Sequence, residues 1–436
     1  MSGPERLPRL LAGTGERRAI GYDDHLALHG ELPLERRRRR RAEPRLVEEL
    51  ELAGLRGRGG GGFPTASKLR AVARARRGPV VVVNATEGEP ASRKDRVLCE
   101  LAPHLILDGA ELVTRALDAD CALVCVCESA PEGAVALSDA IEERRRLDGS
   151  CTRTALRTIP HGYLAGQESA LVAHLNGGPA LPTFTPPMVF EQGVGRRPTF
   201  LSNAETFAHV ALIARHGARW FRELGTTEQP GSALVTLSGA VARPGVYEIA
   251  YGAELSSLVA AAGGATEPVR AALFGGYAGA WIDGSQLNRA ALADEHLAAH
   301  GASLGAGVVL LLGEESCPVA EVTRIARWLA GQSARQCGPC LHGLDALAEA
   351  FGRIAEGGGE GGDLDRVRRL CSLVRRRGAC SHPDGAARFA LSAAEVFAEE
   401  LADHARYGRC PDCDRHPHLP LGGARQDVAR ERVSLS

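Results

Sequence analysis

Two runs of apolar residues in the first half of the chain predict strands that are buried on both faces. The first run is Val80–Val83, and the second covers residues 121–127. Between them lies a helical pattern whose apolar positions are Leu105, Leu112, Val113 and Leu117. A strand, a helix and a second buried strand form a βαβ unit, so we expect a parallel, Rossmann-like sheet with ligands beyond the carboxyl ends of its strands.

A change of pattern near residue 231 predicts a second, β-rich unit. Residues 233–249 read as two strands around an Arg-Pro-Gly turn, a helix is predicted over 255–262, and Val308–Leu312 reads as a further buried strand. This order of elements favours a small β-grasp-like domain.

Beyond Pro318 the apolar spacing is helical to the end of the fold. Apolar residues at i, i+3, i+4 and i+7 predict helical faces. These faces comprise Val322, Ile325, Ala326 and Leu329; Leu344, Leu347, Phe351 and Ile354; and Val367, Leu370, Cys371 and Val374. With a last helix over about 386–402, and a flexible connection at 357–362, the pattern predicts a four-helix bundle.

A glycine-rich stretch, residues 54–68, follows a helix predicted over 45–53. It holds six glycines in nine positions, together with Arg56, Arg58 and Lys68. Glycine is costly to order, so such a run persists where backbone N–H groups approach a ligand closely, and a phosphate or a flat ring is the expected ligand. A flexible linker is the alternative.

The balance of basic residues favours the ligand-binding alternative. Of the 52 lysines and arginines, only Lys68 and Lys94 are lysine. We interpret them as positions where a compact ammonium meets an oxygen as a point charge; chance is the alternative.

Polar side chains gather where the first buried strand ends. Residues 84–96 run from Asn84 through Glu87 to Lys94, which indicates a site, although a salt-bridged turn is the alternative. Two further stretches, 163–171 and 197–206, each lead into a helix, and we expect them to form the remaining walls of the same pocket.

Composition and charge exclude several classes of function. The chain has 436 residues and a net charge of −1, which gives no bulk attraction to nucleic acid. No apolar stretch approaches the ~20 residues of a membrane span, and we expect a cytoplasmic protein. The basic run Arg36–Arg41 is interpreted as a solvated face, with a partner-binding patch as the alternative.

Twelve cysteines in such a chain indicate metal or cluster ligation and buried thiols rather than disulfides. Cys121, Cys125 and Cys127 lie on a predicted strand, and Cys371 lies on an apolar helix face. We expect all four to be core residues.

Five motifs in order resemble the NADH-binding flavoprotein subunit of respiratory complex I and of related NAD-linked hydrogenases and formate dehydrogenases. The likeness covers about residues 45–405. The motifs are residues 54–65, Glu87-Gly-Glu-Pro with Lys94-Asp-Arg, Gly166-Gln-Glu-Ser-Ala-Leu, Arg197-Pro-Thr with Asn203-Ala-Glu-Thr, and Cys337-Gly-Pro-Cys340 with Cys380.

The resemblance implies a division of the chain into domains. The expected parts are a loose lead-in (1–44), an FMN- and NADH-binding α/β domain (45–228), a β-grasp-like SLBB domain (229–315), a helical iron–sulfur bundle (316–408) and a tail (409–436). It also implies that NADH reduces FMN, which passes electrons singly to an iron–sulfur cluster.

Carried over by position, the resemblance assigns a role to each motif. Glu87 and Glu168 would face the nicotinamide nucleotide as catalytic residues, and Phe63 would contribute to its adenine pocket. Cys337, Cys340 and Cys380 would bind iron. The FMN-binding residues would be Gly57, Arg58, Gly59, Gly60, Lys68, Asn84, Gly166 and Asn203.

The chain departs from the family pattern mainly on the NADH side. Thr86 replaces a carboxylate, and the other two aromatics of the adenine pocket correspond to Ala71 and Met188. The lead-in at Ile159–Tyr163 and the Gly166-Gln-Glu-Ser motif are altered too.

The cluster motif is also altered, because the first of its four cysteines falls at Ala334. A cluster with three cysteines could take His342, His382 or an oxygen as fourth ligand, hold three irons as [3Fe–4S] instead of [4Fe–4S], or be lost. Cys410-Pro-Asp-Cys413, with His416 and His418 behind it, is a candidate for a second small metal site, but the motif alone shows too few ligands.

The sequence thus predicts a flavoprotein that moves electrons from NAD(P)H through FMN to an iron–sulfur centre and a protein acceptor or ferredoxin-like partner. It would be a divergent relative of the complex I subunit rather than a component of it. Two alternatives stay open: a catalytically degenerate binding or assembly module, and an FMN relay with a non-nicotinamide donor.

Overall fold

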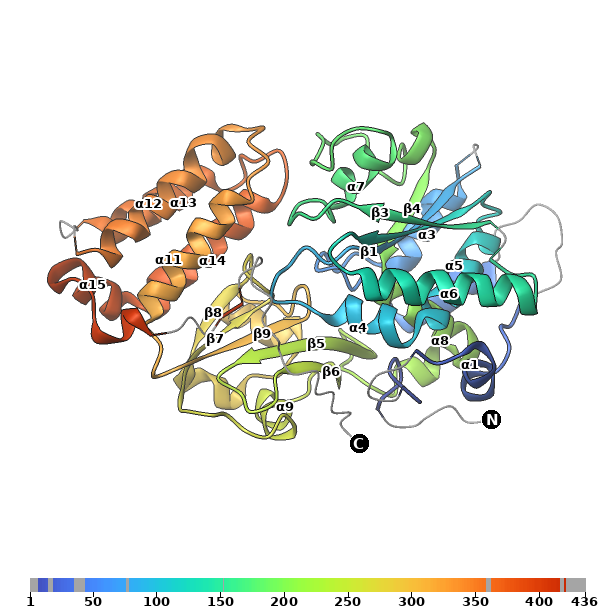
Figure 1. Ribbon diagram of the computed structural model, residues 1–436, viewed down its shortest axis with the longest axis horizontal. Coiled ribbons are helices and arrows are strands. Elements are labelled where there is room, and N and C mark those ends of the chain that lie inside the picture. The colour runs from blue at the N-terminus through green and yellow to red at the C-terminus, as the bar shows by residue number, and fades with distance from the viewer. Residues whose placement is uncertain are drawn as a thin grey trace.

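The computed structural model describes residues 7–14, 19–34, 44–75, 78–151, 153–357, 362–415 and 419–420. Figure 1 shows an elongated molecule, with a parallel α/β unit at one end, a helical unit at the other and a second sheet between them. The basic run Arg36–Arg41 lies outside the described residues.

The first sheet is parallel throughout, as the sequence predicts. Its strand order is β3-β2-β1-β4. Because β1 pairs with β4 in the register Asn84↔Asn203, the two polar strand ends lie side by side. The strands are β1 (Val80–Ala85), β2 (Ala122–Cys127), β3 (Thr154–Ile159) and β4 (Thr199–Asn203).

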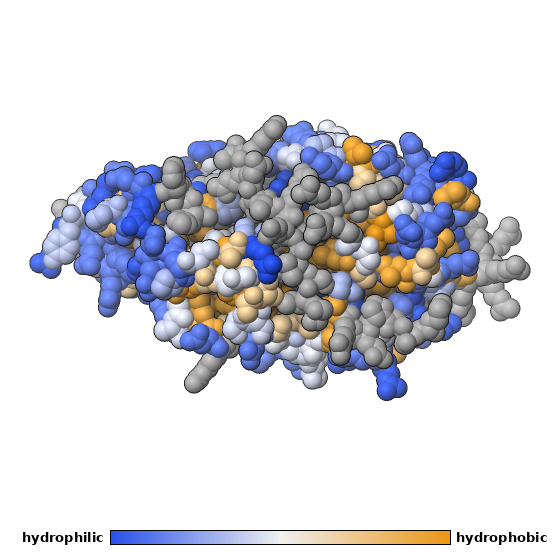
Figure 2. All heavy atoms as spheres, turned by 60° about the horizontal axis from the view of Figure 1, so that its bottom comes forward, coloured by the Kyte–Doolittle hydropathy of each residue, from blue (hydrophilic) through white to orange (hydrophobic). Residues whose placement is uncertain are grey.

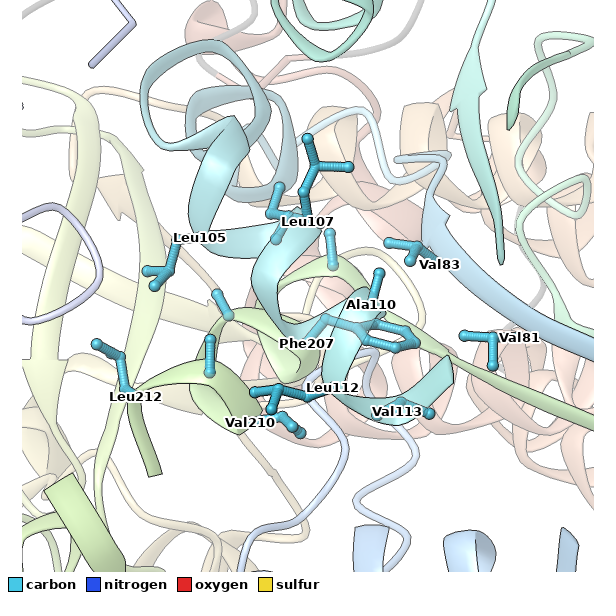
Figure 3. Close-up of a cluster of buried hydrophobic side chains, with 14 of the residues drawn as sticks. Val81, Val83, Leu105, Leu107, Ala110, Leu112, Val113, Phe207, Val210 and Leu212 are labelled. Carbon is cyan, nitrogen blue, oxygen red and sulfur yellow. The ribbon is translucent and has the colours of Figure 1, made fainter. Parts of the chain in front are cut away.

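Helices cover both faces of this sheet because alternate residues of β1 point to opposite sides. Val81 and Val83 join the large core built with α5 and α8 (Figure 3), whereas Val80 and Val82 join a smaller core with α7. The helices are α2 (Pro44–Ala53), α3 (Thr65–Ala73), α4 (Lys94–Leu101), α5 (Pro103–Ala116), α6 (Pro131–Leu147), α7 (Glu168–Leu175), the 3₁₀ turn η1 (Val194–Arg196) and α8 (Ala204–Phe221).

The second sheet is mixed and has the order β6-β5-β9-β7-β8, with β5 and β9 parallel. This agrees with the predicted β-grasp-like unit. Its strands are β5 (Ser232–Gly239), β6 (Gly245–Ala250), β7 (Val269–Phe274), β8 (Ala280–Asp283) and β9 (Val308–Gly313). Its helices and turns are α9 (Leu255–Ala261), η2 (Gly284–Arg289), α10 (Asp294–Leu297) and η3 (Ala298–His300).

One face of this sheet packs on α9, and the other joins the core of the helical unit. Trp281 of β8 is 1% exposed, and its ring centroid lies 5.1 Å from that of Phe397. The sheet therefore connects the two ends of the molecule.

The C-terminal unit is helical, as predicted, but its last predicted helix is divided. A break at Phe397 separates α14 from α15. The elements are α11 (Pro318–Gly331), the π-helical turn η4 (Pro339–Gly343), α12 (Leu344–Ala355), α13 (Asp363–Val374), α14 (His382–Val396), α15 (Ala398–Tyr407) and η5 (Pro411–Asp414). Most of the predicted connection at 357–362 lies outside the described residues.

The expectation of a loose N-terminal lead-in is wrong for residues 7–14 and 19–34. The backbone N–H groups of Arg9 and Leu10 each donate to Glu248 Oε2 of β6 at 2.8 Å. Helix α1 (Tyr22–His29) places His25 Nε2 2.7 Å from Asp108 of α5. Polar contacts and the fully buried Leu10 together hold this segment against the fold.

The expected C-terminal tail also departs from the prediction. Residues 410–415 pack against the helical unit, Leu419 is fully buried, and the Tyr277 hydroxyl donates to the Pro420 carbonyl. The chain after α15 therefore returns to the fold.

Among the described residues, no helix is both long and apolar enough to cross a membrane. On the face shown in Figure 2, the end formed by the helical unit is mostly hydrophilic, and hydrophobic residues reach the surface over the middle of the molecule.

Helices α5 and α8 approach so closely that only glycine fits at position 109. A Cβ atom there would lie 1.9 Å from the Phe207 carbonyl oxygen. Gly109→Ala should therefore lower the free energy of unfolding by about 1–3 kcal/mol or more, measured by urea titration. Gly331→Ala is the control, because a Cβ at this helix position would meet no atom within 4 Å. It should leave the urea midpoint of unfolding unchanged or slightly raised. An unchanged midpoint for Gly109→Ala would show that α5 and α8 separate without cost.

Candidate functional site

A cavity of about 490 Å³ opens at the carboxyl ends of β1 and β4. Three parts of the chain surround it: the glycine-rich loop and strand ends of the α/β unit, loops of the second sheet, and the start of α14. The lining residues used below are Arg58, Gly59, Gly60, Gly61, Asn84, Thr86, Glu87, Gly88, Glu89, Lys94, Asp95, Tyr163, Gly166, Asn203, Cys380 and His382.

Most of the residues predicted for the site line this cavity. The structure brings Arg58, Gly59, Gly60, Asn84, Glu87, Gly166 and Asn203 together there. Gly57, Phe63, Lys68 and Glu168 are not part of the lining. Stretches 163–171 and 197–206 both contribute walls, through Gly166 and Asn203.

The glycine-rich loop is closed at its base and open toward the cavity. The Gly57 N–H donates to the Phe63 carbonyl at 2.9 Å, which fixes both ends of the loop. Gly60 has a φ of 94°, a conformation that side chains with a Cβ rarely adopt. A Cβ on Gly61 would meet no atom within 4 Å. Backbone N–H groups can therefore approach a ligand here.

The two strand-end asparagines fasten the cavity walls. Asn84 Nδ2 donates to the Gly166 carbonyl at 2.8 Å, which ties β1 to the turn before α7. Asn203 Oδ1 accepts from the Glu205 N–H at 3.0 Å and so caps α8, while its Nδ2 donates to Asp95 Oδ2 at 2.6 Å. Both side chains hold other segments in place.

Lys94 forms a buried ionic network beneath the cavity. Its side chain is 3% exposed, and Nζ lies 2.9 Å from both Asp95 Oδ1 and Glu205 Oε2. Burial opposes its charge, but the two carboxylates outweigh burial and raise the pKa of Lys94. Burial raises the pKa of Asp95 to about 6. Burial acts the same way on Glu205, but Lys94, His209 and Arg58 lower its pKa to about 2.

Arg58 joins the α/β unit to the second sheet. Its guanidinium is buried, donates to the Ser232 carbonyl at 3.1 Å and lies 4.6 Å from the centroid of the Tyr251 ring. Glu205 Oε1 reaches the same sheet by accepting from the Leu234 N–H at 3.0 Å. The Arg58 charge is thus committed to the domain junction.

Glu87 holds the start of α4. Its carboxylate accepts from Ser92 Oγ at 2.5 Å and from the N–H groups of Asp95 and Arg96 at 3.2 and 3.3 Å. An acidic group at a helix N-terminus is favoured by the helix dipole. Its role toward a nucleotide stays a prediction.

Glu89 is a cavity residue that the sequence analysis did not single out. Burial raises its pKa to about 7, although it accepts from the N–H groups of Tyr277 and Ala91 at 3.0 and 3.3 Å. It lies in the same motif as Glu87, but its partial burial depends on the loop after β7, where the Tyr277 N–H donates to it. No local pattern carries that information.

Phe63, Lys68 and Glu168 form a separate group at the surface. Lys68 Nζ lies 2.8 Å from Glu168 Oε1 and 5.9 Å from the centroid of the Phe63 ring, and Phe63 is 51% exposed. Lys68 thus meets a carboxylate in this structure, like Lys94. None of the three is among the residues that line the cavity, although the neighbouring Gln167 is.

The three cysteines of the altered cluster motif come together beside the cavity. Burial raises the pKa of the Cys340 thiol, and Cys337 and Cys380 are near enough to raise that pKa further. Cys380 itself lines the cavity. Ala334 is in the loop before them, where Ser333 Oγ donates to the Cys340 carbonyl at 3.2 Å.

The two histidines considered as cluster ligands differ in their surroundings. His342 is exposed. His382 is buried and lines the cavity; its Nε2 donates to the Leu329 carbonyl at 2.9 Å, whereas Nδ1 is buried without a partner. Its ring centroid lies 5.5 Å from that of Tyr163.

Of the four cysteines expected in the core, Cys125, Cys127 and Cys371 are buried, as predicted, whereas Cys121 is half-buried and packs against the edge of the smaller core. Cys410 and Cys413 lie near Cys317 and His404, whereas His416 and His418 lie outside the described residues.

Three family models match the chain. The Nuo51 FMN-binding domain matches residues 50–212, the SLBB domain 234–280, and the NADH-ubiquinone oxidoreductase-F iron–sulfur binding region 320–404. The chain is 33% identical over 379 residues to the NADH-quinone oxidoreductase F 2 subunit of Rhizobium meliloti (strain 1021), covering 84% of this chain and 90% of that protein.

Other relatives include hydrogenase subunits. The NADP-reducing hydrogenase subunit HndC of Solidesulfovibrio fructosivorans is 28% identical, with 84% of this chain and 77% of that protein covered. An NAD⁺-reducing [NiFe]-hydrogenase solved in the H₂-reduced state is 31% identical with a TM-score of 0.76; the match covers 83% of this chain and 62% of that one.

The matches to these models and relatives confirm the resemblance that the motifs predict. The three models cover the parallel α/β unit, the second sheet and the helical unit in the same order as in the structure. The chain belongs to the family of the NADH-quinone oxidoreductase F subunits.

Proposed function

We propose that this chain binds FMN in the cavity, takes electrons from a nicotinamide nucleotide and passes them through an iron–sulfur centre to a protein acceptor. One observation carries the proposal: the glycine-rich loop, the strand ends and Cys380 all line one cavity. A flavin bound there would lie beside Cys380, a proposed ligand of the cluster that would receive its electrons.

The residues present fit FMN. The cavity, about 490 Å³, lies within the roughly 300–1,000 Å³ of small-ligand sites. The backbones of Gly59, Gly60 and Gly61 can approach a phosphate or ring. Gly88 and Gly166 also have no room for a side chain, since a Cβ on either would lie 2.7 Å from a protein oxygen.

When bound, FMN accepts a hydride with two electrons, and an iron–sulfur cluster accepts one electron at a time. The chain supplies the surroundings for that chemistry. Loops of the second sheet form one wall of the cavity. Glu89, with a pKa of about 7, can hold or release a proton on its carboxyl group at neutral pH.

We place the nicotinamide nucleotide toward Phe63, Lys68 and Glu168. The exposed Phe63 ring offers a stacking surface, and Lys68 offers a cation for a phosphate. Thr86 in place of a carboxylate reduces the negative charge near the flavin. Because of this substitution, the second candidate function is an FMN relay that takes its electrons from a non-nicotinamide donor.

The electron acceptor is proposed to be a redox protein, of ferredoxin type, that docks beside the π-helical turn η4. Cys337 is half-buried there, and Leu341 is 39% exposed. A cluster held by this turn would lie near the surface, where a partner can approach it.

The proposed nicotinamide donor can be tested on the FMN-loaded protein. In anaerobic stopped-flow mixing, NADH should bleach the visible flavin absorbance of the FMN-loaded protein, and dithionite defines complete bleaching. An unchanged spectrum with both NADH and NADPH, while dithionite still bleaches it, would contradict a nicotinamide donor and leave the FMN relay. Failure of the protein to take up FMN would contradict the proposal as a whole and favour a binding module.

The fourth position of the cluster is proposed to be filled by His382. A nitrogen that is buried and unpartnered costs free energy unless a ligand uses it, and Nδ1 of His382 is such an atom. Hydrogen bonding at Nε2 fixes the tautomer in which Nδ1 can bind a metal. His342, which is exposed, offers no such arrangement.

Substitution of His382 tests this ligand. His382→Ala should lower the iron retained after exposure to air and increase a three-iron EPR signal in oxidised protein, because one iron loses its ligand. His342→Ala is the matched control and should retain the iron of the unaltered protein. Adding Ala334→Cys to His382→Ala should restore iron by supplying the missing thiolate. Full iron retention in His382→Ala would exclude the histidine as a ligand.

A further inference from the structure

A second group of metal-binding side chains lies outside the flavin cavity. It consists of Cys317, His404, Cys410 and Cys413, and none of these is among the cysteines assigned to the iron–sulfur centre. Their ligand atoms all lie within 4.8 Å of one another. They come from three places: the residue before α11, helix α15, and the two ends of Cys410-Pro-Asp-Cys413.

The spacing of the four atoms suits one tetrahedral ion. Zinc–sulfur bonds of about 2.3 Å and zinc–nitrogen bonds of about 2.0 Å place tetrahedral ligand atoms about 3.5–3.8 Å apart. Here Cys413 Sγ lies 3.4 Å from Cys317 Sγ, 3.6 Å from Cys410 Sγ and 3.4 Å from His404 Nε2. Cys317 Sγ lies 3.5 Å from His404 Nε2.

His404 is held in the orientation that a metal ligand needs. Its Nδ1 donates to the Glu400 carbonyl at 2.8 Å, one turn earlier in α15. This bond leaves the lone pair on Nε2, the atom that faces the cysteines. A fixed second nitrogen of this kind is usual for histidines that bind metals.

Cys317 is prepared in a comparable way. It is the N-cap of α11, and its sulfur accepts from the Ala320 N–H at 3.3 Å. A helix N-terminus stabilises the thiolate form, which is the form that binds a metal. Cys317 and His404 are 4% and 5% exposed, so half of the ligand set is shielded from water.

We propose that Cys317, His404, Cys410 and Cys413 bind a structural zinc ion. Three thiolates and one imidazole fill all four positions of tetrahedral zinc and leave none for a substrate, which excludes a catalytic site. The ion joins the β9–α11 connection to the chain that follows α15. The ion pair between Arg415 Nη1 and Glu315 Oε2, at 3.0 Å, fastens the same two segments.

The site explains why the chain after α15 does not form a free tail. Residues 410–415 carry two of the four ligands and lie beside Cys317, the residue before α11. Closing this link restrains about a hundred residues between the first and last ligand, so metal binding contributes directly to the stability of the helical unit.

The test is metal analysis of the full chain purified with zinc and iron both present. We expect one zinc per chain in addition to the iron of the cluster. The double variant Cys410→Ser, Cys413→Ser should lose the zinc and keep FMN and iron. Cys121→Ser, a half-buried thiol outside both groups, is the control and should keep all three. Absence of zinc, or full zinc in the double variant, would overturn the proposal.

X-ray absorption at the zinc edge provides a test that needs no variant. In the unaltered protein the zinc should show three sulfur neighbours and one nitrogen neighbour. Oxygen ligands, or iron in place of zinc at this site, would overturn the assignment even if the double variant failed to fold.

Discussion

The buried ammonium of Lys94 is the interaction on which the cavity depends. A charge taken out of water must be paired, and removal of one partner of a buried pair typically costs about 3–5 kcal/mol. Asp95 and Glu205 pair with Lys94, Asn203 bonds to Asp95, and Glu205 bonds to the second sheet at Leu234. This single network thus sets α4, α8 and the second sheet around one space.

The same principle explains how the domains are joined. Arg58 reaches the second sheet through the Ser232 carbonyl, and Glu248 of that sheet holds the N-terminal segment through the N–H groups of Arg9 and Leu10. These contacts are polar and buried, so each requires its partner in place. The cavity is therefore bounded by segments that depend on one another.

Sequence reasoning could predict the parts of this arrangement that depend on local pattern. The valines of β1 predict a buried parallel strand, and a parallel sheet brings Asn84 and Asn203 to one edge. It could not predict the partners of Lys94, because Glu205 is 111 residues away and only the fold brings it near. For the same reason the Cys410-Pro-Asp-Cys413 motif alone showed too few metal ligands, because Cys317 is 96 residues from Cys413 and only the fold brings it near.

If the flavin and the cluster cysteines share one cavity, a crystal structure of the FMN-loaded protein will show it. We expect electron density for the isoalloxazine ring within the cavity, between Gly59 and Gly166 on one side and Cys380 on the other. Density for FMN at any other place, or a cavity filled by rearranged side chains in the FMN-loaded crystal, would contradict a shared cavity.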